Sequence, residues 1–187
     1  MHLIYCPIFR DELLAVLGPG HDDLTLHELG YDVHNHSSIM LKQLKEGIRE
    51  AQKKGGTFSI LVGRNCECNI SIRKLAHENK GCVPDYINCI EMFLGREKTL
   101  ELQKNRTALM TPGWIQMIQH AIVSGLWAVE DARMSLGWYN RILLLDTHAA
   151  KISDEEIMEF YDLVQVPIEI MDIDLDHFRS VVEKIIC

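Results

Sequence analysis

The segment that most constrains the fold is an unbroken apolar run at residues 142–145, flanked by Arg141 and Asp146. A continuous apolar run is typical of a strand that is buried on both faces of a parallel sheet. Other short apolar runs alternate along the chain with amphipathic stretches of helical spacing. The pattern therefore predicts an α/β fold of three layers, with a mostly parallel, Rossmann-like sheet and helices on both of its faces.

The same pattern gives the expected order of elements. Strands are predicted at residues 3–5, 24–29, 58–62, 82–84, 107–110, 141–146 and 166–171. Helices are predicted at residues 9–17, 39–54, 72 to near 81, 88–94, a stretch that includes Leu100 and Leu102, 112–129 with Gly125 as an optional break, 155–163 and 175–186. Ser153 and Glu156 have the spacing of a capping box before the helix at 155–163. No Pro/Ser-rich linker divides the chain, so a single domain over residues 1–187 is expected.

Composition narrows the classes of function. Nineteen basic and 27 acidic residues give a net charge of −8, without a basic stripe. This argues against a nucleic-acid partner and against binding to an anionic membrane surface. No apolar run approaches the roughly 18 residues that a membrane span needs. The first residues lack a basic segment followed by an apolar core, so we expect no signal peptide and a cytoplasmic protein. The six cysteines are then free, buried or metal-bound rather than paired in disulfides.

Thiol and imidazole side chains follow the predicted strands, at the points where these strands end. Because the carboxyl ends of parallel strands lie at one edge of a sheet, distant residues of this kind are expected to converge there. The candidate metal ligands are Cys6, His34, Cys66 and Cys89, with His36 and Cys68 as reserve ligands. The alternative is that the cysteines pack as small buried hydrophobic residues, as free cysteine commonly does.

Cys89 has a further feature, its expected place at the start of a helix. The helix dipole lowers the pKa of a thiol at this position, and the thiolate is the form that binds metals and attacks electrophiles. The alternative is that Cys89 packs beneath the helix beside Ile90 and Phe93.

Other residues are expected to line the same pocket. Thr111 suits a helix cap, Gly113 permits close approach of a ligand or of backbone, and Trp114 offers a flat apolar face. The alternative for this segment is simply a well-formed helix start. Asp146 and His148 are the nearest candidates for an acid–base pair. The complete predicted pocket is Gly63, Asn88, Thr111, Gly113, Trp114, Asp146 and His148.

Two blocks of sequence, at residues 88–95 and 107–114, carry a resemblance to a known family. Together with Cys6, the pair His34 and Asn35, and the turn at 63–66, they make the chain similar to the domain-of-unknown-function family 1638 of methanogens and anaerobic bacteria. The resemblance implies an anaerobic setting near corrinoid-dependent methyl-transfer systems, an association rather than a mechanism.

The resulting hypothesis is a metal-site protein of anaerobic one-carbon metabolism that uses a Cys/His pocket at the strand ends. Thiolate and imidazole ligands favour zinc, or iron, over magnesium or calcium. A corrinoid protein or a methyltransferase is the expected partner, and a corrinoid is a further candidate cofactor. The alternatives are a non-catalytic module that binds or chaperones a corrinoid or metal cofactor, and a structural partner of a methyltransferase. Whether the protein is an enzyme stays open at this point.

Overall fold

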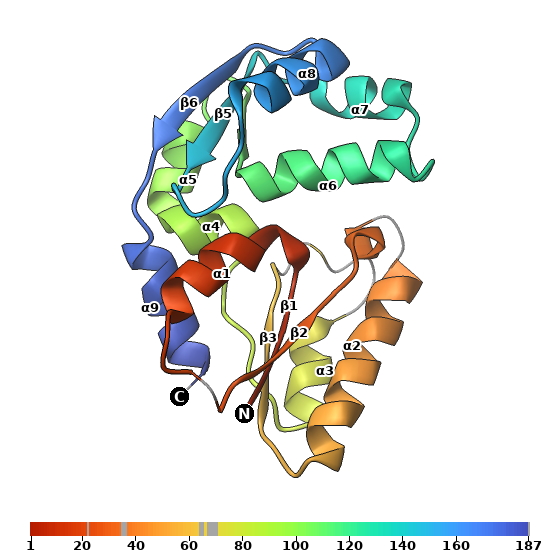
Figure 1. Ribbon diagram of the computed structural model, residues 1–187, viewed down its shortest axis with the longest axis vertical. Helices are drawn as coiled ribbons and strands as arrows, with labels where there is room; N and C mark the ends of the chain where they lie inside the picture. Colours follow the sequence, from red (N-terminus) through yellow and green to blue (C-terminus); the bar gives the residue numbers. More distant parts are fainter. Residues whose placement is uncertain (22, 35–36, 64–65, 67–70, 187) are drawn as a thin grey trace.

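The computed structural model describes residues 1–21, 23–34, 37–63, 66 and 71–186 (Figure 1). Within these residues the strands form two sheets of three, with all neighbouring strands parallel. The first sheet has the order β2-β1-β3 and the second has the order β4-β5-β6. The strands are β1 (His2–Tyr5), β2 (Thr25–Glu28), β3 (Phe58–Leu61), β4 (Thr107–Met110), β5 (Arg141–Asp146) and β6 (Ile168–Asp172).

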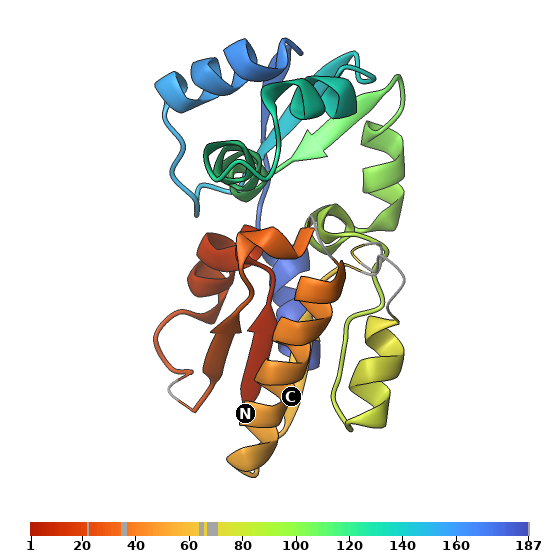
Figure 2. The same cartoon turned by 90° about the vertical axis from the view of Figure 1, so that its right-hand side faces the viewer.

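Helices cover the faces of both sheets, so the α/β class with parallel strands is confirmed. In Figure 2, α2 lies in front of the first sheet and α9 lies behind it. In the part of the chain described, the helices are η1 (Pro7–Phe9), α1 (Arg10–Leu17), η2 (Tyr31–His34), α2 (Ser37–Lys53), α3 (Ile72–Glu78), α4 (Cys89–Leu94), α5 (Arg96–Leu102), α6 (Pro112–Val123), α7 (Val129–Leu136), α8 (Asp154–Val164) and α9 (Asp176–Ile185). None of these helices has the length and apolar character needed to cross a bilayer.

Several local predictions agree with the structure. Residues 142–145 are fully buried in the central strand β5. The capping box of α8 is present, since the Glu156 N–H donates to Ser153 Oγ and the Ser153 N–H donates to Glu156 Oε2. The expected strand at 82–84 is reduced to one parallel bridge between Ser59 and Cys82. Pro84, two residues after Cys82, has no N–H with which to extend the ladder.

The division into two sheets changes where the strand ends lie. The carboxyl ends of the first sheet and those of the second point toward each other in the middle of the molecule (Figure 1). After the second sheet, α9 returns to the first, where the Ser59 hydroxyl of β3 donates to the carbonyl of Ile185. We call the region where the two sheets face each other the junction. The rings of Phe9, Phe93 and Phe178 pack together there, with centroids 4.6–5.7 Å apart.

The closest approach across the junction is between α6 and η1. A Cβ placed on Gly113 would lie 2.5 Å from the carbonyl oxygen of Ile8, which is backbone and cannot rotate away. Gly113 was expected to permit close approach of either a ligand or backbone, and the approaching group is backbone. This contact sets how near the start of α6 lies to the end of β1.

We expect Gly113→Ala to lower the free energy of unfolding by about 1–3 kcal/mol, because the added methyl group overpacks a rigid contact. Urea unfolding followed by circular dichroism measures the change. Ser135→Ala, at an exposed position of α7, is the control and should shift stability by less than about 0.5 kcal/mol. Equal stability of the two variants would contradict this account of the junction.

Candidate functional site

Cys6 and His34 meet at the carboxyl edge of the first sheet. Cys6 directly follows β1 and is 1% exposed, and His34 is the last residue of η2, which follows β2. Their Sγ and Nε2 atoms are joined by a hydrogen bond of 3.0 Å. Burial raises the pKa of the Cys6 thiol well above its usual value and lowers the pKa of His34 to about 4. At neutral pH the pair is therefore an uncharged thiol beside an uncharged imidazole.

Cys66 and Cys89 lie in the same neighbourhood. Burial is the main cause that raises the pKa of Cys89 to about 12, and charge on Cys66 is the second cause. Charge on Cys66 is also the second cause of the raised pKa of Cys6. The Cys66 N–H donates to the carbonyl of Gly63 at 3.1 Å, and a Cβ on Gly63 would lie 2.9 Å from the Cys89 nitrogen, so Cys66 lies near the start of α4. Three thiols and one imidazole from four separate segments are thus gathered at one sheet edge.

Trp114 connects this group to the second sheet. It stands in the first turn of α6, and its indole N–H donates to Cys89 Sγ at 3.1 Å. Its ring also faces that of His34, with centroids 5.4 Å apart. The expectation that the helix start lowers the pKa of Cys89 is wrong. Cys89 is 3% exposed, and the cost of burying a thiolate outweighs both the short helix and the indole hydrogen bond.

The other pocket residues on this side serve mainly structural roles. Asn88 caps α4, because its Oδ1 accepts from the Glu91 N–H at 2.9 Å. Gly63 packs against this cap, where a Cβ would lie 2.8 Å from the Asn88 Cα. Thr111 precedes α6 but does not cap it through its side chain, which differs from the sequence prediction. Its buried Oγ1 has no hydrogen-bond partner among the described residues.

A cavity of about 340 Å³ opens beside Cys89. Its walls are mostly apolar and come from the start of α4 and from β4, α6 and α7, so the cavity lies where α4 meets the second half of the molecule. The thiol of Cys89 and the ring of Trp114 both lie on its lining. A small organic group in this space would contact the buried thiol of Cys89 directly.

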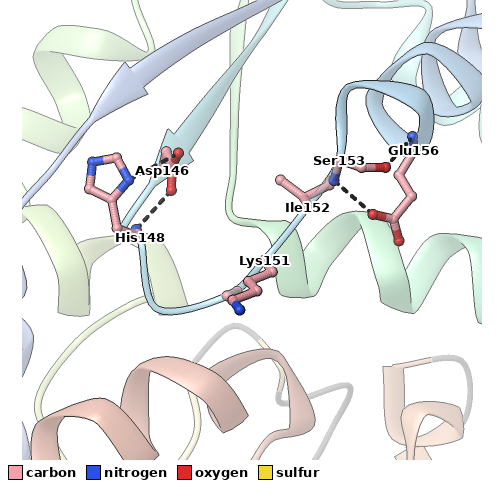
Figure 3. A pocket seen from close by; sticks show the side chains of 7 residues that line it. Asp146, His148, Lys151, Ile152, Ser153 and Glu156 are labelled. Carbon is pink, nitrogen blue, oxygen red and sulfur yellow. Dashed lines mark hydrogen bonds and ion pairs between the residues drawn. The ribbon is translucent and has the colours of Figure 1, made fainter.

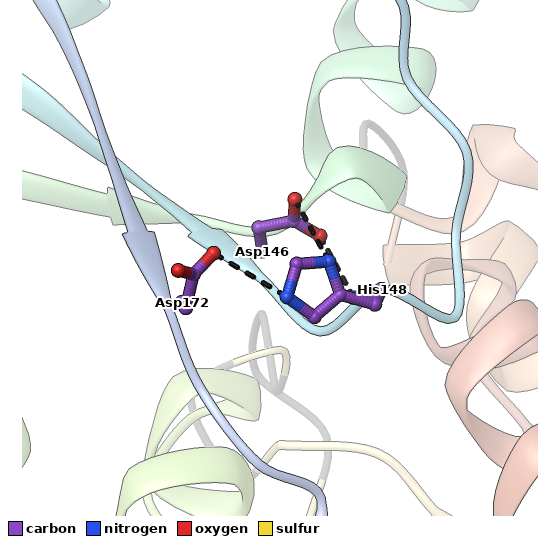
Figure 4. Close-up of side chains that lie close together, drawn as sticks. All are labelled: Asp146, His148 and Asp172. Atoms are coloured by element: carbon purple, nitrogen blue, oxygen red, sulfur yellow. Dashed lines mark hydrogen bonds and ion pairs between the residues drawn. The ribbon is translucent and has the colours of Figure 1, made fainter.

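Asp146 and His148 lie elsewhere, at the carboxyl edge of the second sheet. They line a separate cavity of about 470 Å³ between β5 and the start of α8 (Figure 3). His148 also lies near Asp172, the last residue of β6 (Figure 4). Sequence reasoning missed Asp172, although the rule that selected Asp146, a polar residue at a strand end, applies to it equally.

The spacing of ligand atoms differs between the two groups. Among the described residues, Asp146, His148 and Asp172 are the one group of three or more metal-ligating side chains with ligand atoms all within 4.8 Å of one another. In the thiol and imidazole group, Cys6 Sγ and His34 Nε2 lie at hydrogen-bond distance, 3.0 Å, but no three of the described residues Cys6, His34, Cys66 and Cys89 have ligand atoms all within 4.8 Å of one another. The reserve ligands His36 and Cys68 lie outside the described residues. Metal binding by Cys6, His34, Cys66 and Cys89 stays a prediction.

Glu12 is a second residue that sequence reasoning missed. It is a buried carboxyl group of α1, and Thr147 Oγ1 donates to its Oε1 at 3.1 Å across the junction between the sheets. Burial raises the pKa of Glu12 to about 7, although the Thr147 hydrogen bond favours the ionised form. The signal was present, since Glu12 is three residues after Phe9 and four before Val16, on the apolar stripe of the helix.

Fold and site together define an α/β protein with two parallel sheets. The carboxyl ends of their strands face each other around a group of three thiols and one imidazole. The family model described as "Protein of unknown function (DUF1638)" matches residues 29–182. The chain belongs to this family, as its resemblance predicted. No curated protein and no solved structure matches it.

The raised pKa of Glu12 predicts how stability depends on pH. The folded state holds the proton up to about pH 7, whereas the unfolded chain releases it near pH 4.5, so this contribution is complete below pH 4.5 and is lost as the pH rises to 7. Glu12→Gln keeps an acceptor for Thr147 without the charge. We expect its stability relative to wild type to rise by about 3 kcal/mol between pH 4.5 and 8.

Urea unfolding of both proteins at the two pH values measures this difference. His34 titrates within the same range, but it does so in both proteins and its effect cancels. Glu159→Gln, which removes an exposed carboxylate of α8, is the matched control and should follow wild type. A constant difference between Glu12→Gln and wild type would mean that the pKa of Glu12 is the same in the folded and unfolded states.

Proposed function

We propose that this protein holds a thiophilic metal ion, zinc or iron, with Cys6, His34, Cys66 and Cys89 as its ligands. The observation that supports the proposal is that these four donors lie in one neighbourhood, with Cys6 and Cys89 buried, Cys66 and His34 partly buried, and Cys6 hydrogen-bonded to His34. Three thiolates and one imidazole are a Cys₃His donor set, which suits a tetrahedral ion of this kind.

The electrostatics of the donors fit this assignment. Burial keeps the thiols of Cys6 and Cys89 protonated and the imidazole of His34 neutral when no positive charge is near. A bound cation reverses this preference, because a coordinating thiol loses its proton and a neutral imidazole offers its lone pair. The site therefore stays uncharged until a cation enters, which avoids burying unpaired charges.

The chain's own residues prepare a place for a reacting group. The indole N–H of Trp114 orients Cys89, and the adjacent cavity of about 340 Å³ has room for a small organic group. A closed set of four ligands would make the ion structural. With one of the four displaced, a bound ion would have an open position and would supply a Lewis acid that lowers the pKa of a substrate thiol. Because the family is associated with corrinoid-dependent methyl transfer, we propose that the protein takes part in this reaction in the cytoplasm of an anaerobe. Its proposed partner is a corrinoid protein or a methyltransferase.

A non-catalytic corrinoid carrier is the second candidate and has less support. In that role His34 would be the axial ligand and Trp114 would cover the corrinoid ring. However, Nε2 of His34 is engaged by Cys6, and its ring is packed beside Trp114. A macrocycle would have to displace both contacts before it reached the imidazole.

Metal analysis of protein purified without oxygen tests the ligand set. We expect about one zinc or iron per chain in the wild type, and a loss of most of this metal in Cys89→Ser and Cys66→Ser, because serine is a poor ligand for such ions. Cys82→Ser is the matched control, since Cys82 is exposed and lies outside the set. Equal metal content in all four proteins, or none in the wild type, would refute the ligand set.

A second measurement tests methyl transfer itself. With methylcobalamin and a small alkyl thiol supplied anaerobically, the methyl group would pass to sulfur, the thiol proton to solvent, and cob(I)alamin would be released. We expect its absorbance to appear with metal-loaded wild type and to fall at least tenfold with Cys89→Ser. Metal-loaded protein without any such activity would favour the carrier or the structural partner.

A further inference from the structure

We infer that Asp146, His148 and Asp172 form a second cation site, which takes a hard divalent ion of the Mn²⁺ class. Asp146 and Asp172 are partners in register on the neighbouring parallel strands β5 and β6. Their carboxylates therefore leave the second sheet side by side at its carboxyl edge. Two carboxylates at one sheet edge, with an imidazole between them, provide a donor set of oxygen and nitrogen atoms (Figure 4).

A tight turn brings the imidazole into this position. His148 adopts a left-handed backbone conformation with φ of 56°, and its N–H donates to Asp146 Oδ1 at 2.7 Å. Its ring then lies between the carboxylates, with Nδ1 3.4 Å from Asp146 Oδ2 and Nε2 3.4 Å from Asp172 Oδ1. His148 lies in the turn two residues after β5. It is the third member of the group, beside Asp146 of β5 and Asp172 of β6.

The spacing of the three groups suits a shared ion. Donor atoms about 2.2 Å from one ion are separated by roughly 4.4 Å at most. The ligand atoms here all lie within 4.8 Å of one another, so a side-chain shift of less than about 1 Å closes the set. Without an ion, the alternative is an imidazolium that pairs with both carboxylates.

The chemistry of this site differs from that of the thiol group. Carboxylate oxygens with one imidazole suit Mn²⁺ and related ions, whereas thiolates select softer ones. The side chains of His148 and Asp172 are 67% and 78% exposed, so an ion can enter directly from solvent. The adjacent cavity of about 470 Å³ would accommodate the water or substrate that fills the remaining coordination positions (Figure 3).

Titration of the full chain with Mn²⁺, with free Mn²⁺ followed by electron paramagnetic resonance, tests this inference. We expect one Mn²⁺ per wild-type chain and binding at least tenfold weaker in Asp172→Asn and in His148→Asn. Asparagine tolerates the left-handed backbone at position 148. Asp162→Asn is the matched control, because it removes the same charge from an exposed position of α8 outside the cluster. Circular dichroism establishes that each variant is folded.

Cys89→Ser separates this site from the proposed thiol site. It should bind Mn²⁺ as the wild type does, even where its zinc or iron content is lost. The inference is overturned if wild type binds no Mn²⁺ below the millimolar range, or if Asp172→Asn and Asp162→Asn bind it equally. It is also overturned if Mn²⁺ binding disappears in Cys89→Ser and survives in Asp172→Asn.

Discussion

The architecture depends on the contact of two backbones, Gly113 of α6 against Ile8 of η1. The candidate site residues lie where strands end, and the contact between Gly113 and Ile8 fixes how closely the start of α6 approaches the end of β1. The approach places Trp114, which follows the fourth strand, on Cys89 and His34, which belong to the first half of the fold. The stacked rings of Phe9, Phe93 and Phe178 fill the rest of the junction with apolar surface.

Burial at this junction has one consistent electrostatic effect: it drives titratable groups toward their uncharged forms. The pKa values of Cys6, Cys89 and Glu12 are raised and that of His34 is lowered, in each case mainly by burial. Thiol, carboxyl and imidazole groups therefore lie near one another in their uncharged forms, without pairing as ions. A cation bound there, as proposed, would reverse this effect at the thiols, because it stabilises their deprotonated form.

The sequence predicted the class of fold because periodicity reports burial, as the continuous run of β5 shows. It also predicted which residues follow strands, and therefore that Cys6, His34, Cys66 and Cys89 would approach one another. Strand pairing is a long-range property, so alternation of elements does not reveal that β3 and β4 lie in different sheets. The pKa of Cys89 was misjudged for a related reason: a helix start is a local feature, whereas burial depends on Trp114 and the rest of the junction.

The arrangement separates two kinds of ligand chemistry by sheet. The proposed thiol and imidazole ligands lie within residues 6–89, at the first sheet and α4, and the carboxylates of the second group lie at the ends of β5 and β6. Thr147 lies between Asp146 and His148 in the chain, and its hydroxyl donates to Glu12 of α1. The turn that carries His148 therefore also carries a hydrogen bond between the two halves of the fold. A cation bound at this turn, as proposed, would therefore lie next to a hydrogen bond that joins the two halves of the fold.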